Sequence, residues 1–574
     1  MLPDLLVTVA LFLLTVLGLG WPLASRLALT PTEKLLASTG LSILGAYLFA
    51  WIVYVADLPA DTLWALPIMA AVGLMSGVAG LRVVVRDPLT RTVFAMYLLV
   101  TLWCVGWLGM VSTYTGGGWS GDWFEHWERS RFFLEHWPRD RTFLVIYTLP
   151  ARPPLANVIT GAFLHFTRVD FAHYQLISTL LAGLVFLPAT VLAQAFRRGF
   201  GSAATDGDLR LPALVAMLFM VNPLFVQNAT FAWTKLPAAF LVLAALHFFL
   251  RAQAPAAPRS AGLLCAVLLA GGFLAHYSAG PYIAVLVVAW LGFGWSRRRD
   301  PVWWRETMLA TGLGAAVLAT WFGWSLSVYG TGGTLLSNTS VTAVDTSAGS
   351  QLVRIALNLR DTLVPHFLRS LDQGLIAQRS PWGWWHDWFF QAYQLNLPLA
   401  FGSVAWLVLL RELIRTRVSA APGARRFWTA FIVGVVFLGV ATHGARDTWG
   451  LTHICLQPLV LLGLAWLAAR WAELGRGWQL ALVAGATVDL AAGVVFHFAI
   501  QNFALDRLLT PARDVRDVVM SYNAVTTGNT FALAKNGLDT FSVWLNAPAI
   551  LLGAVLAVLF FLVLIRTRVR AAKT

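Results

Sequence analysis

A cluster of ionisable side chains directly follows a glycine-rich turn in the first long polar segment of the chain, which reads GGGWSGDWFEHWERSR from Gly116. In a helix beginning at Asp122, the spacing of Asp122, Glu125 and Arg129 places all three residues on one face. A carboxylate in such a position acts as a general base toward an acceptor hydroxyl or amine, when partial burial and a neighbouring arginine set its pKa. Asp122 and Glu125 are therefore the candidate catalytic residues, and Arg129 is a candidate substrate-binding residue.

The same segment is rich in aromatic residues, which favour the interface between membrane and water. They give the predicted helix an apolar face, and we expect this helix to lie flat on the bilayer. An amphipathic surface helix whose charges are simply solvated is the alternative interpretation. The aromatic residues are Trp119, Trp123, Phe124, Trp127, Phe132, Phe133 and Trp137.

Further basic and hydrogen-bonding side chains stand at the ends of apolar segments that we expect on the same side of the membrane. A phosphoryl leaving group needs positive charge and hydrogen-bond donors, and these residue types supply both. Each also has a structural alternative, such as a snorkelling lysine, a packed histidine or a local ion pair of Arg446 with Asp447. The candidate phosphate ligands are Lys235, Arg446 and His453, and the candidate substrate-binding residues are His276 and Tyr277.

The composition indicates the elements that must position these residues. Of the 574 residues, 58% are hydrophobic and 12% are charged, against about 25% charged in soluble domains. Apolar runs of span length recur from end to end, which excludes a soluble enzyme, a disordered protein and a peripheral membrane protein. The chain is therefore predicted to be an all-α, polytopic helical membrane protein. We attribute its net charge of +14 to cationic cytoplasmic loops and expect no nucleic-acid partner.

The apolar runs predict about fifteen transmembrane helices, with the N-terminus outside. A further stretch, 153–167, is short for a span, and we expect it to form a second surface helix in the first outer loop. The predicted spans are 3–25, 36–56, 62–81, 92–112, 172–196, 211–229, 236–251, 261–276, 279–296, 306–329, 397–415, 427–442, 450–469, 478–500 and 543–565.

These spans divide the chain into five parts. Four N-terminal helices (1–112) precede a catalytic first outer loop (113–171), core helices (172–329), a second outer loop (330–396) and C-terminal helices (397–574) that enclose the outer loop 501–542. The short connections on the other side are basic, which identifies that side as cytoplasmic. No P-loop or Rossmann motif occurs in them, which argues against an ATP-driven pump. These basic connections carry Arg82, Arg86, Arg91, Arg197, Arg198, Arg297, Arg298, Arg299, Arg411 and Arg415.

The order of residues in the first outer loop resembles a known family. Asp122 is followed by Arg129 and Arg131, and then by Tyr147 and the run Ala151-Arg152-Pro153-Pro154-Leu155. This order resembles the polyprenol-dependent glycosyltransferases of the GT-C superfamily, particularly the aminoarabinose-transferase and protein O-mannosyltransferase branch. In that branch an acidic residue begins the first outer loop, and Tyr or Phe precedes a Lys- or His-Pro-Pro-Leu motif. The resemblance is clearest over 120–200 and extends loosely to about residue 300.

The resemblance implies a GT-C-like fold and an inverting glycosyltransferase that uses a polyprenyl-phosphate sugar as donor. Asp122 would be the base that binds the acceptor, Arg152 would contact the donor phosphate, and Tyr147 would bind substrate. The acceptor would be a glycan, a lipid or a protein, and the site would face the periplasm from a bacterial inner membrane. We expect no cofactor, and a metal is not supported, because Lys235 stands where relatives often have a second acid.

Three departures from the family pattern accompany the resemblance. Besides Lys235, Trp123 follows the first acid, where relatives usually have a charged residue, and three additional helices precede the loop. The alternative functions are a secondary transporter or lipid flippase, and an O-antigen ligase or polymerase-like enzyme. A transporter favours charges at the midplane, where the chain offers Asp489. A ligase would use a late loop, for which 501–542 offers Arg507, Arg513 and Arg516.

Overall fold

The structure is a computed structural model. It describes residues 2–110, 122–143, 147–198, 208–254, 257–338, 351–365, 389, 391–419, 422–443, 450–496 and 541. These parts of the chain are helices joined by turns, with one antiparallel bridge between Phe143 and Tyr147. The predicted all-α class is confirmed.

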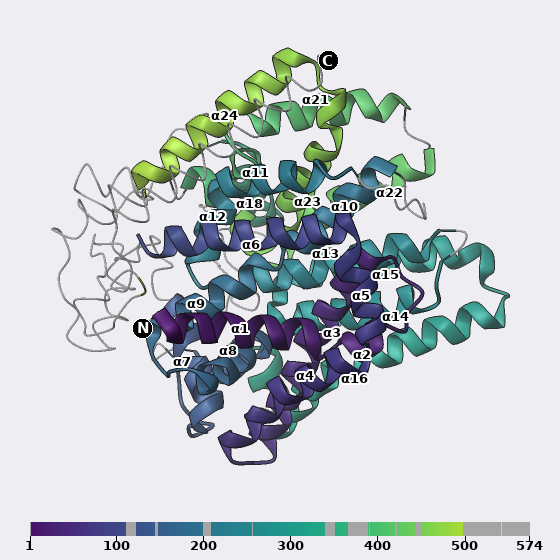
Figure 1. The fold of residues 1–574 in the computed structure, drawn as a ribbon. Helices are drawn as coiled ribbons and strands as arrows, with labels where there is room; N and C mark the ends of the chain where they lie inside the picture. The colour runs from purple at the N-terminus through teal and green to yellow at the C-terminus, as the bar shows by residue number, and fades with distance from the viewer. Residues whose placement is uncertain are drawn as a thin grey trace.

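The helices carry the labels of Figure 1, in chain order. The first part of the chain forms α1 (Leu2–Gly18), α2 (Trp21–Ala24), α3 (Pro31–Val55), η1 (Ala60–Trp64), α4 (Ala65–Ser76), α5 (Val78–Arg86), α6 (Pro88–Leu108), α7 (Asp122–Glu135), η2 (Leu149–Ala151), α8 (Leu155–Phe166), α9 (Phe171–Gly183), α10 (Phe186–Arg198), α11 (Leu211–Val221), α12 (Pro223–Thr230) and α13 (Lys235–Ala252).

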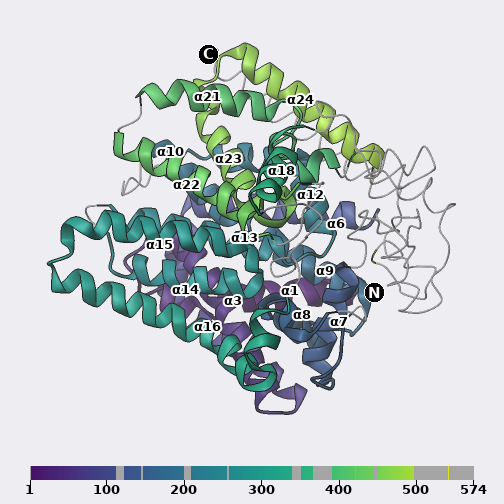
Figure 2. The ribbon, with the colours of Figure 1, turned by 180° about the vertical axis from the view of Figure 1, so that it is seen from behind.

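The second part forms α14 (Ser260–Ala275), η3 (Tyr277–Ala279), α15 (Gly280–Gly294), η4 (Trp295–Arg297), α16 (Pro301–Leu335), α18 (Gln351–Leu363), the π-helix η8 (Gln391–Leu395), α20 (Leu397–Ala400), α21 (Ala405–Ser419), α22 (Pro422–Ala441), the π-helix η9 (Thr452–Leu456), α23 (Gln457–Arg470), η10 (Trp471–Glu473) and α24 (Arg476–Val494). Figure 2 shows α14, α15 and α16 side by side on the far face of the molecule.

Within the described residues, ten helical segments are long and apolar enough to cross a membrane, and two bent helix pairs raise the number to 12. The outer helices expose large apolar side chains, such as Val288 on α15 (71%), Met308 on α16 (66%) and Val433 on α22 (61%). A surface of this kind suits lipid and not water. The chain is thus an integral, multi-pass membrane protein.

The predicted count of fifteen spans is not confirmed. The segments 62–81 and 211–229 are bent pairs, α4 with α5 at 80° and α11 with α12 at 73°. The segment 261–276 forms α14, which has only 16 residues. The segment 397–415 is divided between α20 and α21, and 543–565 lies outside the described residues.

Two of these breaks have identifiable causes. Pro223 cannot donate a backbone hydrogen bond, so a helix must restart there, and Asn222 caps the new helix by accepting from the N–H of Phe225 (2.9 Å). Gly402, between α20 and α21, has φ +120°, a conformation that favours glycine. The carboxylate of Asp489 on α24 accepts hydrogen bonds from Tyr393 and from the backbone N–H of Ser403 (2.9 and 3.0 Å). Asp489 therefore stabilises the irregular segment beside Gly402.

The centre of the bundle is formed by a few helices that are surrounded by others. The most apolar window of the segment Phe171–Arg198 is entirely buried, and that of α13 is 89% buried. By contrast, the corresponding windows of α16 and α24 are 22% and 17% buried. The buried helices α9, α10 and α13 are therefore the scaffold, and α16 and α24 face the lipid.

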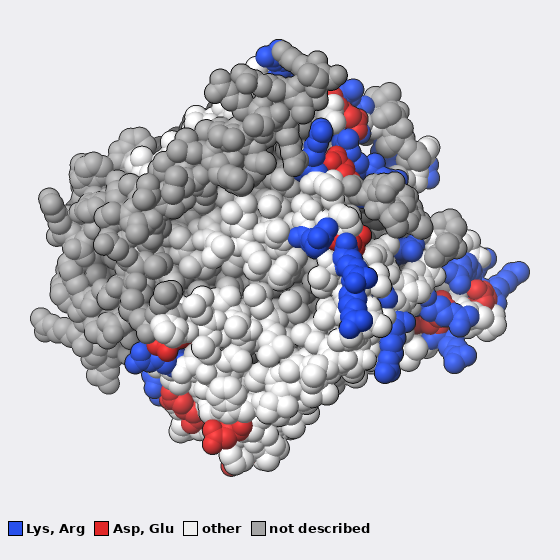
Figure 3. Space-filling view, viewed as in Figure 1, with Lys and Arg blue, Asp and Glu red and all other residues white. Residues whose placement is uncertain are grey.

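Most Lys and Arg side chains visible in Figure 3 gather at one end of the bundle, and a smaller, mixed group of acidic and basic side chains lies at the opposite end. Figure 3 shows Lys and Arg at the end formed by α5 and the α15–α16 connection, beyond a broad band without charges. Arg82, Arg298 and Arg299 are exposed at this end. The N-terminus and α7 lie at the opposite end (Figures 1 and 2). This separation agrees with the division into two faces that the sequence predicts.

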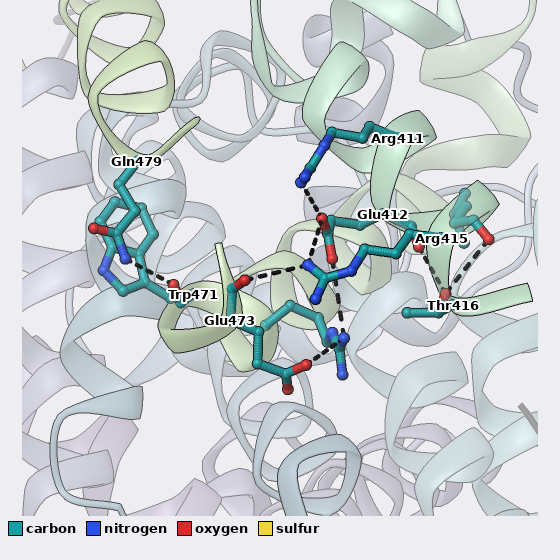
Figure 4. Close-up of polar contacts among 9 residues, drawn as sticks. Arg411, Glu412, Arg415, Thr416, Trp471, Glu473 and Gln479 are labelled. Carbon is teal, nitrogen blue, oxygen red and sulfur yellow. Dashed lines mark hydrogen bonds and ion pairs between the residues drawn. The ribbon is translucent and has the colours of Figure 1, made fainter. Parts of the chain in front are cut away.

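Ion pairs join α21 to α23, and α23 to η10, at the basic end (Figure 4). Glu412 on α21 is completely buried, and Arg411 and Arg415 approach its carboxylate from the same helix. Arg470, at the end of α23, lies 3.9 Å from Glu412 and also pairs with Glu473. The buried carboxylate thus holds three guanidinium groups from two helices together.

The first outer loop forms two helices, as predicted, but both are packed inside the protein and do not lie on its surface. On α7, Phe132 and Phe133 are buried against Tyr54 of α3, with ring centroids 5.8 and 5.1 Å away. The whole of α8 except His165 is buried. The aromatic face was predicted to contact lipid because the sequence does not reveal that α3 covers it.

Candidate functional site

A cavity of about 140 Å³ lies where the first outer loop meets the ends of α13, α14 and α22. Its wall brings together residues from seven separate places in the chain, from α7 to the π-helix η9. The lining residues are His126, Tyr147, Arg152, Pro153, Trp233, Lys235, His276, Tyr277, Ser278, Pro281, Asn338, Gly439, Thr442, His443, His453, Ile454 and Cys455.

The backbone around Arg152 is held by side chains from two directions. Arg129 on α7 donates to the carbonyl oxygens of Leu149 (2.7 Å) and Thr148 (3.0 Å). From η3, the hydroxyl of Tyr277 donates to the carbonyl oxygen of Pro150 (3.0 Å). These bonds fix the segment that precedes Arg152, and Pro153 and Pro154 restrict the backbone after it. The position of Arg152 in the cavity wall is thus set by the fold.

Glu125 lies behind the cavity wall and joins the two arginines of the loop. Its side chain is completely buried, with one oxygen 2.7 Å from Arg129 Nη2 and the other 3.4 Å from Arg152 Nε. Burial raises the pKa of the Glu125 carboxyl, but the charges of Arg152 and Arg129 outweigh this effect and hold the pKa below its ordinary value. Glu125 is therefore a carboxylate, and it orients Arg152 toward the cavity.

Lys235 is the first residue of α13 and supplies the second cation of the cavity. Its Nζ lies 3.7 Å from the centre of the Trp233 ring, and only 6% of the residue is exposed. The chain turns sharply just before it, where Ala232 has φ +55°. A helix N-terminus carries partial positive charge, which adds to that of the lysine. The part of the cavity at Lys235 therefore favours an anionic group.

Four histidines line the cavity, and two of them, His126 and His276, are fixed by different partners. His126 on α7 has its Nδ1 3.2 Å from Oδ1 of Asn157 on α8. His276, between α14 and η3, accepts at Nδ1 from the backbone N–H of Ser278 (3.1 Å). Burial lowers the pKa of His126 to about 3. Burial, with the charges of Lys235 and Arg152, lowers the pKa of His276 well below its ordinary value.

A network of buried amides supports His453 from below. His453 lies in the π-helix η9, and its carbonyl oxygen accepts from Gln457 Nε2 (2.7 Å). Gln457 also donates to Asn228 on α12 (2.6 Å), which donates in turn to Gln394 on η8. Buried amides of this kind define one arrangement because each lost partner is costly. The network joins three irregular helices beneath the cavity.

The structure brings most of the predicted site residues together. Arg152, Lys235, His453, Tyr147, His276 and Tyr277 all line the cavity. Glu125 and Arg129 lie behind its wall. Arg446 lies outside the described residues, and so does the side chain of Asp122, although α7 begins at that residue.

His126 and Trp233 line the cavity but were not among the predicted site residues. For His126 a signal was present, because it follows Asp122 by four residues and the two positions therefore share a face of α7. The prediction used the spacing from Asp122 to Glu125 and Arg129. Around the helix, these two residues lie on the other side of Asp122 from His126. For Trp233 no local signal exists, since its place depends on the turn at Ala232.

The charges of the cavity determine what it can bind. Among its described lining residues, two are permanent cations, Arg152 and Lys235, and none is a carboxylate. The histidines and tyrosines add uncharged hydrogen-bond donors and acceptors. Within the described part of the chain, no group of three metal-binding side chains is placed to hold a metal ion. The arrangement favours a phosphate with a polar group attached to it.

Comparisons with known proteins give the following similarities. No protein-family model and no curated protein matches the chain. ArnT from Cupriavidus metallidurans bound to undecaprenyl phosphate is similar with a TM-score of 0.46 and 15% identity, over 76% of this chain and 74% of that chain. The apo state of the same protein gives 0.39 and 17% over the same shares.

The archaeal oligosaccharyltransferase AglB from Archaeoglobus fulgidus, in complex with an inhibitory peptide and a dolichol-phosphate, is also similar. Its TM-score is 0.33 and its identity 12%, over 71% of this chain and 55% of that chain. The polyprenyl phosphates are ligands of ArnT and AglB.

Proposed function

We propose that this protein is a membrane glycosyltransferase that transfers a sugar from a polyprenyl-phosphate donor to an acceptor on the extracytoplasmic face. The observation that carries the proposal is the cavity with Arg152 and Lys235 in its wall and no carboxylate among its described lining residues. His126 in its wall belongs to α7, which lies at the end of the bundle opposite the basic end (Figures 1 and 3), the end that the sequence predicts to be outside. The order of residues in the first outer loop supports the same assignment.

In this proposal, Arg152 and Lys235 bind the donor phosphate, with His453 and Arg446 as further ligands. Glu125 and Arg129 act through Arg152, because Glu125 contacts its guanidinium group and Arg129 holds the segment before it. Tyr147, whose ring centre lies 5.0 Å from the Arg152 guanidinium, borders the same group. Asp122, one helical turn before His126, is the catalytic base.

The reaction is a single displacement with inversion. The acceptor oxygen, or nitrogen, forms a bond to the anomeric carbon, and the bond between that carbon and the phosphate oxygen breaks. The electron pair of the broken bond leaves with the polyprenyl phosphate, where the two cations stabilise it. The acceptor proton passes to Asp122, which serves as general base.

The test is the transfer activity of purified protein with radiolabelled polyprenyl-phosphate sugars. Asp122→Asn removes the base but keeps the shape of the side chain, so transfer should fall by about 100-fold or more. Donor binding should stay within about threefold of wild type, since the phosphate ligands are untouched. Transfer by the variant within threefold of wild type would contradict the role of Asp122, and no transfer by wild type from any donor would contradict the proposed activity.

A lipid flippase is the second candidate, and the broken helix pair α11–α12 favours it. Discontinuous helices with a polar centre are typical of transporters, and Asn228 of the buried amide network lies on α12. The test is translocation of a fluorescent polyprenyl phosphate in proteoliposomes, with Asn228→Leu as the variant. Translocation by wild type that the variant abolishes, without any transfer activity, would favour the flippase.

A further inference from the structure

Two of the four histidines that line the cavity, His126 and His276, present opposite hydrogen-bonding atoms to the ligand. A backbone N–H can only donate, so Nδ1 of His276, which accepts from Ser278, carries no proton. The proton of the neutral ring therefore resides on Nε2. The hydroxyl of Ser278 also lies 2.8 Å from Nδ1 and supports the same assignment.

His126 has the reverse arrangement. The amide oxygen of Asn157 can only accept, so Nδ1 of His126 donates to it and carries the proton. Nε2 of His126 is then an unprotonated acceptor. Within the described residues, Nε2 of each ring has no hydrogen-bond partner and stays accessible from the cavity that both rings line. One ring thus offers an acceptor and the other a donor.

The unprotonated Nε2 of His126 limits which chemical groups of a ligand can bind beside it. A fully ionised phosphate has no proton to donate, so it would repel the lone pair of His126 Nε2. An ammonium group has protons, but the charges of Arg152 and Lys235 oppose its entry. A hydroxyl satisfies both demands, because it is uncharged and both donates and accepts.

We propose that His126 and His276 form a sugar-hydroxyl subsite beside the phosphate position. Nε2 of His126 accepts the proton of a sugar hydroxyl, and Nε2–H of His276 donates to a sugar oxygen. The proposal rests on the proposed function and assigns the part of the cavity that distinguishes a sugar-bearing donor from bare polyprenyl phosphate. Asn157 and Ser278 are positioning residues, since they act through the two rings.

The surroundings of the two rings favour the neutral form of both histidines. His126 faces Glu125 and Arg129 on its own helix, Asn157 on α8, and Arg152. His276 faces Lys235 on α13, Arg152 and His126. Burial is the main effect that opposes protonation of both rings, and the neighbouring cations add to it, whereas Glu125 favours protonation of His126.

The experiment compares two probes by isothermal titration calorimetry of the protein in nanodiscs. One probe is undecaprenyl phosphate, and the other is undecaprenyl phosphate carrying a hexose. Wild type should bind the hexosyl probe more tightly. His126→Phe and His276→Phe should each weaken the hexosyl probe by about tenfold, as the loss of a buried hydrogen bond does, and should leave the sugar-free probe unchanged. Unchanged binding of that probe also demonstrates folding.

Three further variants complete the test. His126→Gln restores an acceptor and should recover part of the preference for the hexosyl probe. Arg152→Gln should weaken both probes. His165→Phe, on α8 outside the cavity lining, is the matched control and should change neither affinity.

The pH dependence of the preference for the hexosyl probe tests whether His126 accepts a hydrogen bond from the sugar or only packs against it. In wild type, the preference should be flat between about pH 8 and 5, because His126 stays neutral when its pKa is lowered by burial. Asn157→Asp places a carboxylate at Nδ1 and raises the pKa of His126, so its Nε2 becomes protonated on acidification and can no longer accept. The hexosyl preference of this variant should then disappear as the pH falls.

Each outcome decides a different question. If wild type binds both probes equally, or if the Phe variants keep the hexosyl preference, the sugar subsite is refuted while the phosphate site stands. If the Phe variants weaken both probes alike, the histidines are phosphate ligands and the inference is wrong. If wild type binds neither probe, the proposed function itself fails.

Discussion

At the scale of single residues, Arg152 faces the cavity, but its position depends on Glu125, an anion that lies behind the cavity wall. Glu125 is completely buried and contacts both Arg129 and Arg152. Its removal would take away the carboxylate that both guanidinium groups contact, and the loss of one partner from a buried ion pair is among the costliest changes in a protein interior. The function of Arg152 therefore depends on Glu125, which lies behind the cavity wall.

Glu125→Gln should destabilise the protein by about 3 kcal/mol at neutral pH, as the loss of one partner from a buried pair does. The pKa of Glu125 is held below its ordinary value, so its stabilisation is present above that ordinary value and disappears as the pH falls through the lowered one. Thermal unfolding in detergent should thus show wild type and variant converging on acidification.

The matched control for this variant is Glu135→Gln on the same helix. Glu135 pairs with Arg131 at 2.8 Å, but both side chains are about a third exposed, so the change should cost less than about 1 kcal/mol. Equal destabilisation by the two variants would contradict the special role of Glu125.

The sequence predicts part of the candidate site because charged residues at span ends must gather at one face of the membrane. Lys235, His276 and His453 were grouped on this ground, and all three line the cavity. The sequence does not predict which side of α7 faces the cavity, since that depends on packing against α3 and α8. Consequently Glu125 was assigned to the site surface and His126 was missed.

At the scale of elements, α7 and α8 pack so closely that a glycine is required between them. A Cβ atom added at Gly161 of α8 would lie 2.5 Å from the carbonyl oxygen of Ser130 on α7. Ser130 belongs to the same helix as His126, so separation of the two helices would also displace the cavity wall.

Gly161→Ala should therefore destabilise the protein by about 1–3 kcal/mol, as overpacking does, and should weaken donor binding. The measurement is thermal unfolding together with calorimetric titration of undecaprenyl phosphate. Gly312→Ala on α16 is the control: a Cβ atom there meets nothing within 4 Å, and alanine improves helix propensity by up to about 1 kcal/mol. Greater damage from Gly312→Ala would refute the close contact of α7 with α8.

The helix breaks differ in how far sequence can predict them. Asn222-Pro223 is a recognisable signal for a helix restart, yet hydropathy alone joins 211–229 into one span. At Gly402 the signal is weaker, because the break depends on Asp489, which is distant in sequence and reaches the N–H of Ser403 through the fold. Long apolar runs therefore predict that helices exist but not where they bend.

At the scale of the whole molecule, the separation of charges predicts the orientation in the membrane. The three native cysteines are buried, so an introduced cysteine reports its own position. Arg139→Cys, beyond α7, should react from outside with a membrane-impermeant thiol reagent. Arg298→Cys and Gly423→Cys should react only after the membrane is opened. The reversed pattern would place the cavity on the cytoplasmic side and contradict the proposed function.

The length of α16 ties the cavity to the thickness of the bilayer. The helix has 35 residues but is kinked at Gly330 (φ +68°), so its regular part before the kink runs about 40 Å, against a hydrocarbon core of about 30 Å. The end of this regular part is fixed to the first outer loop, where Tyr329 donates to the carbonyl oxygen of Arg139 (2.8 Å). Asn338, beyond the kink, lines the cavity. Lipids with longer or shorter acyl chains change the tilt of such a helix. A change of tilt would act on the first outer loop through Tyr329, so we expect the thickness of the bilayer to influence donor binding in the cavity.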